Sequence, residues 1–158
     1  MQLTLYTDYS LRVLVYLGLK GEQLSTISEI AQHYGISRNH LVKVVHNLAS
    51  HGFIHTARGK GGGMRLARPP QEINIGDVVR HTEGTFNLVE CFDVAGSGCP
   101  ITPICKLKGA LHRAMHSFMS VLDSYVLADV LENGEQLSGM LQVVKVEDIK
   151  RPHSRPDA

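Results

Sequence analysis

The sequence predicts a mainly α-helical fold with one small β-hairpin. Two observations lead to this class. First, apolar side chains recur at helical spacing over residues 28–34 and 38–50, and Gly35 separates the two stretches, which is typical of a helix-turn-helix. Second, two short strand-like runs follow directly and are joined by a basic, glycine-rich segment. A hairpin of this kind, placed after the second helix of the motif, predicts a winged helix-turn-helix domain.

The first helix is expected from about Asp8 to Leu19, with Thr7 or Asp8 as its N-terminal cap. Gly21 is expected to end this helix, because glycine readily adopts the backbone conformation in which helices stop. The apolar positions expected to face the core are Leu11, Leu14, Val15 and Leu17.

The helix-turn-helix is expected within residues 27–50. In its first helix, which ends at Tyr34, the inward-facing residues are Ile27, Ile30 and Ala31. The second helix is expected over Arg38–Ser50, with Ser37 as its cap. Successive residues of an α-helix are rotated by about 100°, which places the apolar residues of this helix on one side. These residues are Leu41, Val44, Val45 and Leu48. The opposite side carries Asn39, Lys43 and His46, as expected of a recognition helix that faces DNA.

The predicted wing consists of strand-like runs at residues 53–56 and 64–67, joined by residues 57–63. The glycines of this connection also raise the possibility of a phosphate-binding P-loop. A P-loop requires a Ser or Thr directly after its Gly-Lys pair, between a strand and a helix. Here Gly61 follows Gly59-Lys60. We therefore reject the P-loop and favour the tip of a wing.

The remaining chain is expected to break at Pro69-Pro70 and to form a helix near residues 75–81. The longest helical stretch is expected from about residue 105 to 130, with an apolar stripe at Leu107, Leu111, Ala114, Phe118, Leu122 and Tyr125. The next position at this spacing is Asp129, which is charged. Such a stripe favours pairing with a second copy of the chain, although packing within one chain remains open. The expected regions are the DNA-binding domain (1–82), the cysteine loop (83–105), the dimerisation helix region (106–139) and a disordered tail (140–158).

Charge is distributed unevenly along the chain, although its net charge is only +1. Residues 1–80 contain nine Lys and Arg against five Asp and Glu, whereas residues 81–158 contain seven against ten. A basic segment in a near-neutral protein indicates a polyanion such as DNA as its partner, with an unevenly charged surface as the alternative. The sequence has no apolar run long enough to span a bilayer and no signal peptide at its start, so we expect a cytoplasmic location without membrane association.

All three cysteines of the chain, Cys91, Cys99 and Cys105, lie in the cysteine loop. The gaps between them are seven and five residues, and the segment contains glycines and prolines that suit a tight wrap around a small object. An odd number of thiols cannot form a complete set of intrachain disulfides. Zinc sites usually contain closely spaced cysteine pairs, which are absent here. An iron–sulfur cluster is therefore favoured, while zinc, a thiol switch and inert thiols remain open.

Together these motifs resemble those of the iron–sulfur winged-helix repressors, and most closely the NsrR type, which senses nitric oxide. The resemblance rests on residues 3–14, on the Ile-Ser-Glu-Ile-Ala segment at 27–31, on the wing at 58–63 and on the three cysteines. It extends from the start of the chain to about residue 135. It implies a homodimeric, DNA-binding transcriptional repressor rather than an enzyme, which releases DNA when nitric oxide attacks its cluster.

The resemblance also implies the ligands of the cluster. Regulators of the IscR type have a histidine three residues after the third cysteine, where this chain has Lys108. The NsrR type uses an aspartate near the start of the first helix, which reaches the cluster of the partner subunit, and Asp8 occupies that position. The expected ligands are thus the three cysteines and Asp8, around a 4Fe–4S rather than a 2Fe–2S cluster. A simple helix-start charge is the alternative role for Asp8.

On double-stranded DNA, we expect a dimer bound to an inverted-repeat operator. Two alternatives to a nitric-oxide sensor remain: a regulator that senses iron or cluster status, as the IscR type does, and an iron–sulfur electron carrier. The residues expected to contact DNA are Arg38, Asn39, His40 and Lys43 in the recognition helix and Arg58, Lys60, Gly61 and Gly62 in the wing.

Overall fold

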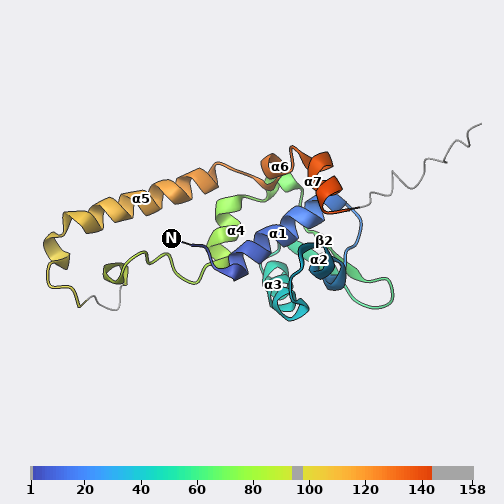
Figure 1. Ribbon diagram of the computed structural model, residues 1–158, viewed down its shortest axis with the longest axis horizontal. Helices are drawn as coiled ribbons and strands as arrows, with labels where there is room; N and C mark the ends of the chain where they lie inside the picture. The colour runs from blue at the N-terminus through green and yellow to red at the C-terminus, as the bar shows by residue number, and fades with distance from the viewer. Residues whose placement is uncertain (1, 94–97, 144–158) are drawn as a thin grey trace, which may run out of the picture.

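A computed structural model of the chain describes residues 2–93 and 98–143. Its elements are α1 (Leu5–Lys20), α2 (Ile27–Tyr34), α3 (Arg38–Ser50), β1 (Ile54–Ala57), β2 (Gly63–Leu66), η1 (Pro70–Glu72), α4 (Ile75–Thr82), η2 (Glu90–Phe92), η3 (Thr102–Ile104), α5 (Lys106–Asp123), α6 (Leu127–Val130) and α7 (Gly134–Met140). Figure 1 shows two parts: a compact domain around α1, and α5, which projects from it with the cysteine loop at its far end. The predicted winged helix-turn-helix fold is confirmed.

The core of the domain is built around α1, which contacts α3, α4, α6 and β2. The apolar residues that α1 buries in this core are Val13, Leu14, Tyr16, Leu17 and Leu19. The four apolar residues predicted for α3 are all buried, and the bounds of α3 match the prediction. The positive φ of 61° at Gly21 ends α1, as predicted. The recognition helix is therefore fixed on a rigid apolar base.

The start of α1 differs from the prediction, because the helix begins at Leu5 and its cap is Thr4 rather than Thr7 or Asp8. The hydroxyl of Thr4 accepts a hydrogen bond from the backbone N–H of Thr7 at 3.3 Å. Thr7 itself is completely buried and cannot serve as a cap outside the helix. The additional turn places Asp8 inside the first turn of α1, with its side chain partly exposed.

A polar clamp joins α1 to α2. Glu29 accepts hydrogen bonds from the Tyr16 hydroxyl at 2.9 Å and pairs with Lys20 at 2.8 Å. Thr26 and Glu29 also form a reciprocal capping box, a sequence signal that the prediction did not use. Burial alone raises the pKa of Glu29, but the hydrogen bonds from Lys20 and Tyr16 outweigh it and hold that pKa below its ordinary value.

The predicted helix from residue 105 to 130 was too long, because α5 ends at Asp123 and a separate short helix follows. The side-chain amide of Asn74 donates hydrogen bonds to the carbonyls of Asp123 and Tyr125, at 2.7 and 3.2 Å. The backbone of Leu127 then donates to Ile73 at 2.8 Å, which buries the Leu127 side chain in the core. These contacts with residues 73–75 override the local helical preference.

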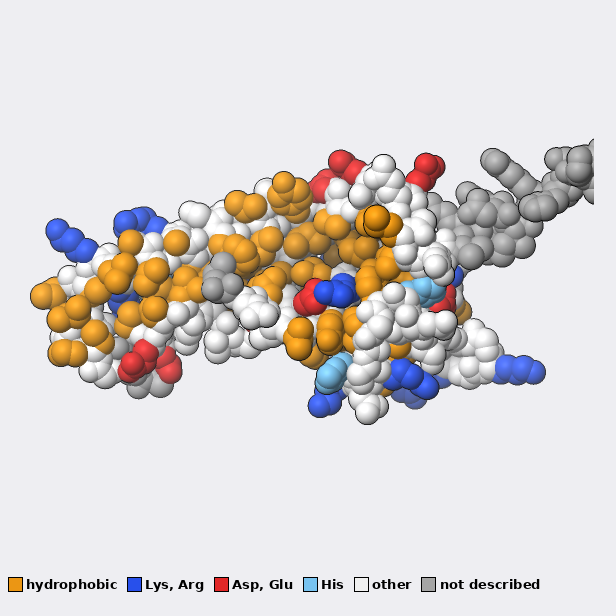
Figure 2. Space-filling model, in the orientation of Figure 1, with side chains coloured by type: hydrophobic (Ala, Val, Ile, Leu, Met, Phe, Trp, Pro, Cys, Tyr) orange, Lys and Arg blue, Asp and Glu red, His pale blue; other side chains and the backbone are white. Residues whose placement is uncertain are grey.

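The outer half of the structure leaves a large apolar surface open. None of the residues of α5, all of which are described, is buried, and Leu107 is 66% exposed. Figure 2 shows hydrophobic side chains gathered along α5 and the cysteine loop. Of the predicted tail, residues 144–158 lie outside the described part of the chain, whereas Val143 is buried. Among the described residues, every helix is too short or too polar to span a lipid bilayer.

Candidate nucleic-acid interface and cysteine loop

The outer face of α3 is polar and open. Arg38, Asn39, His40 and Lys43, the four residues predicted to contact DNA, are all exposed, and three of them lie in the first turn of the helix. Figure 2 shows Lys and Arg side chains along this edge of the molecule and at the hairpin tip. Backbone N–H groups and positive partial charge at the start of a helix favour an anion, so the phosphate backbone suits this end of α3.

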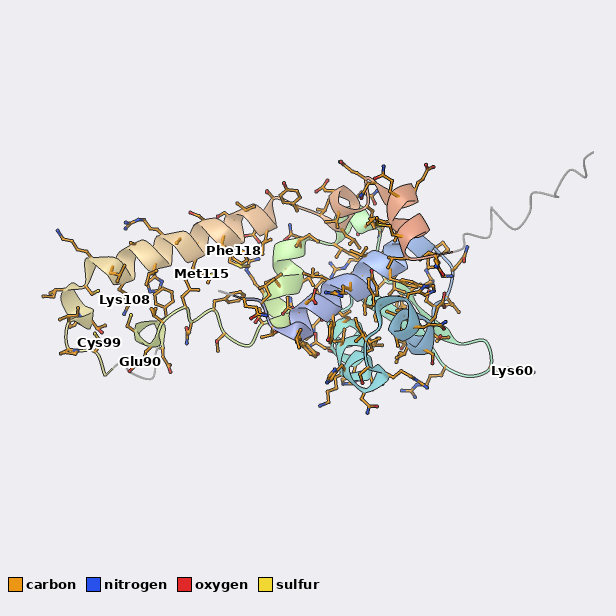
Figure 3. The ribbon with its side chains drawn as sticks, in the orientation of Figure 1. Lys60, Glu90, Cys99, Lys108, Met115 and Phe118 are labelled. Atoms are coloured by element: carbon orange, nitrogen blue, oxygen red, sulfur yellow. The ribbon has the colours of Figure 1, made fainter. Side chains whose placement is uncertain are left out.

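The wing is a two-stranded antiparallel hairpin in which Ile54 pairs with Leu66 and Ala57 with Gly63. Its base is fixed to the segment before α2, because Ser25 and Met64 exchange two backbone hydrogen bonds of 2.9 and 2.8 Å. The buried face of the hairpin belongs to the core, while its tip is exposed. Figure 3 shows Lys60 at this tip, at the end of the domain away from α5.

Glycines at the tip are required by the hairpin itself. Gly59 and Gly61 have φ values of 96° and 81°, which side-chain-bearing residues rarely adopt. A Cβ at Gly62 would collide with the backbone carbonyl of Ala57, across the turn. Gly61 and Gly62 were predicted as DNA contacts, and the structure gives a local, conformational reason for glycine at both positions. The conformational requirement and the predicted DNA contact are compatible, because a tip without side chains at these positions is narrow.

The first turns of α1 pack directly against the recognition helix. The hydroxyl of Tyr6 donates a hydrogen bond to the backbone carbonyl of Lys43 at 3.1 Å. The ring of Tyr9 lies 6.1 Å from that of His40, centroid to centroid. The position of α1 therefore bears directly on two residues predicted to contact DNA.

The three cysteines occupy different settings in the cysteine loop. Cys91 lies in η2 and is half-buried, Cys99 is exposed, and Cys105 is half-buried as the N-terminal cap of α5. The sulfur of Cys105 accepts a hydrogen bond from the backbone N–H of Lys108 at 3.4 Å. Figure 3 places Cys99, Glu90 and Lys108 together at this end of α5.

Among the described residues of the cysteine loop, Glu90 and Phe92 make contacts that help to hold its shape. Oε1 of Glu90 accepts a hydrogen bond from the backbone N–H of Gly98 at 2.9 Å, which draws together the residues next to Cys91 and Cys99. The ring of Phe92 stacks on that of His112 in α5, with centroids 3.9 Å apart and planes 10° apart. His112 therefore has a packing role in the structure.

The three predicted cysteine ligands share one loop, whereas the fourth predicted ligand, Asp8, lies in α1. Within residues 2–93 and 98–143, no three His, Cys, Asp or Glu side chains are grouped closely enough to hold a metal ion. Asp8 instead forms an ion pair with Arg12, one turn later in α1, at 2.7 Å. Figure 1 shows α1 well separated from the end of α5 that carries the loop.

The donor chemistry of the loop nevertheless fits an iron–sulfur cluster. Thiolates are the usual ligands of such clusters. The sulfur of Cys105 lies at the N-terminus of α5 and already accepts a hydrogen bond from a backbone N–H group there. The cations of Lys106 and Lys108 at the same helix end favour a negatively charged group as well. A ligand from α1 would have to come from a second copy of the chain.

Comparison with known proteins matches residues 3–133 to the Rrf2 family, described as iron-dependent transcriptional regulators. The chain belongs to the Rrf2 family. It is 49% identical over 144 residues to the HTH-type transcriptional regulator NsrR of Bacillus subtilis, covering 90% of this chain and 99% of that protein. It is 50% identical to NsrR of Geobacillus kaustophilus, covering 90% of this chain and 97% of the relative.

A solved structure of IscR from T. potens has the same fold, with a TM-score of 0.66 and 26% identity, covering 87% of this chain and 90% of that one. The resemblance found in the sequence is thus confirmed, and the protein is a DNA-binding transcriptional regulator rather than an enzyme. No signal in the sequence pointed to the contact of Tyr6 with Lys43 or to the contact of Glu83 with Thr4. Only Thr4, a good cap residue three positions before Thr7, offered a signal for the true start of α1.

Proposed function

We propose that this Rrf2-family regulator is a homodimeric repressor that holds an iron–sulfur cluster and releases DNA in response to nitric oxide. The observation that carries the proposal is the joining of a three-thiol loop, at the N-terminus of α5, to a winged helix-turn-helix domain. The relatives named NsrR support it, because the resemblance to that type implies a nitric-oxide-sensitive cluster.

Cys91, Cys99 and Cys105 would hold the cluster, with 4Fe–4S preferred, and Asp8 of a second copy would be its fourth ligand. Two observations favour a contribution from the second copy. Asp8 is separated from the loop of its own chain, and its side chain is 39% exposed and therefore accessible to another subunit. The open apolar surface of α5 is the natural place for the two copies to meet.

When bound, the cluster supplies iron with which nitric oxide reacts. In the protein itself, the proposed change is an exchange of partners by Asp8. Asp8 has Arg12 one turn away, so its carboxylate can leave the partner's loop and form the ion pair that the single chain shows. Without this ligand, α1 would no longer be attached to the second subunit. A movement of α1 would then shift α3, because Tyr6 of α1 is hydrogen-bonded to Lys43 of α3. A coupling of about 2–3 kcal/mol, or about 30–150-fold in DNA affinity, is sufficient.

On DNA, each α3 would enter the major groove while the wing contacts the neighbouring backbone or minor groove. Arg38, Asn39, His40 and Lys43 would approach base edges from α3. Arg58 and Lys60, with the narrow backbone of Gly61 and Gly62, would contact phosphates or the minor groove. Two such domains related by a twofold axis require an inverted repeat.

The test is the absorption spectrum and iron content of the protein purified without oxygen, before and after addition of nitric oxide. The proposal predicts bound iron and sulfide with visible absorbance, and loss of that absorbance with nitric oxide. Iron-free protein after reconstitution would contradict the cluster. A cluster that resists nitric oxide but is lost on iron limitation would favour the sensor of iron status instead.

A further inference from the structure

Glu83 lies at the joint between the cysteine loop and the DNA-binding domain. It directly follows α4 and is the first residue of the loop. Its Oε1 accepts a hydrogen bond from the backbone N–H of Thr4 at 2.7 Å and another from the Thr4 hydroxyl at 3.1 Å. Thr4 is the cap of α1, so the loop and the first helix are joined through one carboxylate of the same chain.

The carboxylate of Glu83 is well placed to set the start of α1. A negative charge at a helix N-terminus interacts favourably with the helix dipole and with N–H groups that lack partners inside the helix. Thr4 connects Glu83 to the first turn of α1, because its hydroxyl also accepts a hydrogen bond from the backbone N–H of Thr7. A shift of Glu83 would therefore displace or fray the first turn of α1.

The first turn of α1 in turn contacts the recognition helix. Tyr6 lies two residues after Thr4, and its hydroxyl donates to the carbonyl of Lys43 in α3. Tyr9 contacts the ring of His40. Three successive contacts thus lead from the loop to α3: Glu83 to Thr4, Thr4 to the first turn, and Tyr6 to Lys43.

The residues before α1 are also enclosed by the loop. Gln2 and Leu3 line a hollow of about 180 Å³ together with loop residues 85–88 and with Met115 and Phe118 of α5. Figure 3 shows Met115 and Phe118 on the side of α5 that faces this region. A change in the path of the loop would thus act on the N-terminal segment at several points, with Glu83 as its hydrogen-bonded contact.

We propose that Glu83 is a positioning residue that transmits the state of the cysteine loop to the recognition helix within one chain, through Thr4 and Tyr6. This inference rests on the proposed function, since it assumes that the loop has two states. It adds to the contribution of Asp8, which acts between subunits. Glu83 needs no contact with the cluster, and its removal leaves all four proposed ligands in place.

The experiment compares Glu83→Ala, Tyr6→Phe and the double variant with the wild type. For each dimer, the affinity for one duplex is measured with the cluster loaded and after its removal, and the ratio of the two affinities is the readout. The duplex is one enriched from a random library by the cluster-loaded wild type. Each single variant is expected to reduce the ratio by roughly 2–30-fold while retaining iron. Because the two residues act in series, the double variant should lose no more than the larger single loss.

Glu72→Ala, which removes an exposed glutamate from η1, is the matched control and should keep the wild-type ratio. Glu83→Gln keeps an acceptor oxygen without the charge, so its ratio should lie between those of the wild type and Glu83→Ala, and it guards against misfolding of the alanine variant. A wild-type ratio in both Glu83 variants, or additive losses in the double variant, would overturn the inference. If the wild type held no cluster, or bound DNA equally well with and without its cluster, the proposed function itself would be overturned.

Discussion

Asp8 has two possible partners in the proposed mechanism: Arg12 in its own helix and the cluster held by a second copy. The ion pair with Arg12 is exposed, and pairs of this kind contribute little to stability. Asp8 can therefore leave Arg12 at small cost when a stronger partner is available. The same property makes its role testable without disturbing the fold.

A heterodimer of one Asp8→Ala chain and one Cys99→Ala chain tests whether ligation crosses subunits. If it does, the cysteines of the first chain and Asp8 of the second form one complete site. We expect about half of the wild-type iron, with wild-type resistance to chelators. The Asp8→Ala homodimer, which lacks both carboxylates, is the control. A heterodimer whose cluster is as labile as that of this homodimer would exclude ligation by the partner's Asp8.

Lys43 and Lys60 should both strengthen DNA binding, but through different contacts. If Lys43 reads a base, Lys43→Ala should cost about 1–3 kcal/mol and relax preference at one position. If Lys60 contacts phosphate, Lys60→Ala should weaken all sequences alike and lower the salt slope by about one unit. Competition assays with substituted half-sites at two salt concentrations separate the outcomes. Identical patterns for the two variants would contradict the assignment.

At the scale of elements, the clamp between α1 and α2 should make stability depend on pH. The folded pKa of Glu29 lies below its ordinary value of 4.5, so its stabilisation is complete above that pH and is lost as pH falls through the folded pKa. Glu29→Gln should therefore reduce the free energy of unfolding most at neutral pH. The difference from the wild type should shrink below about pH 4.5.

Chemical unfolding of the cluster-free dimer between pH 7 and pH 3 measures this dependence. Glu72→Ala, outside the clamp, should leave the wild-type pH profile unchanged. A difference between wild type and Glu29→Gln that persists undiminished at pH 3 would show that the clamp does not depend on the charge of Glu29.

The sequence predicted those elements whose signals are local. Apolar spacing located α3 to the residue, and Gly21 marked the end of α1. The end of α5 could not be predicted, because it depends on Asn74, which is distant in sequence and takes up the carbonyls at that end. In the same way, the cysteines were visible in the sequence as a cluster, whereas Glu83 has significance only through its tertiary contact with Thr4.

At the scale of the whole molecule, the open face of α5 predicts a dimer. Leu111 lies on the apolar stripe with Leu107 and Phe118, and a charge there should prevent burial against a second copy. Leu111→Glu is expected to give a folded monomer by analytical ultracentrifugation. Ser120→Glu, on the opposite side of the helix, is the control and should remain a dimer. A dimeric Leu111→Glu protein would place the interface elsewhere.

The central claim is that the cluster in the cysteine loop controls the binding of DNA by α3 and the wing. It is tested most directly by titrating nitric oxide, without oxygen, into the cluster-loaded dimer bound to its selected duplex. Cluster absorbance and fluorescence anisotropy of the DNA are followed in the same sample, with Cys99→Ala as the cluster-free reference. We predict that absorbance and binding are lost together, ending at the weak affinity of Cys99→Ala. Undiminished DNA binding after complete loss of the cluster absorbance would contradict the claim.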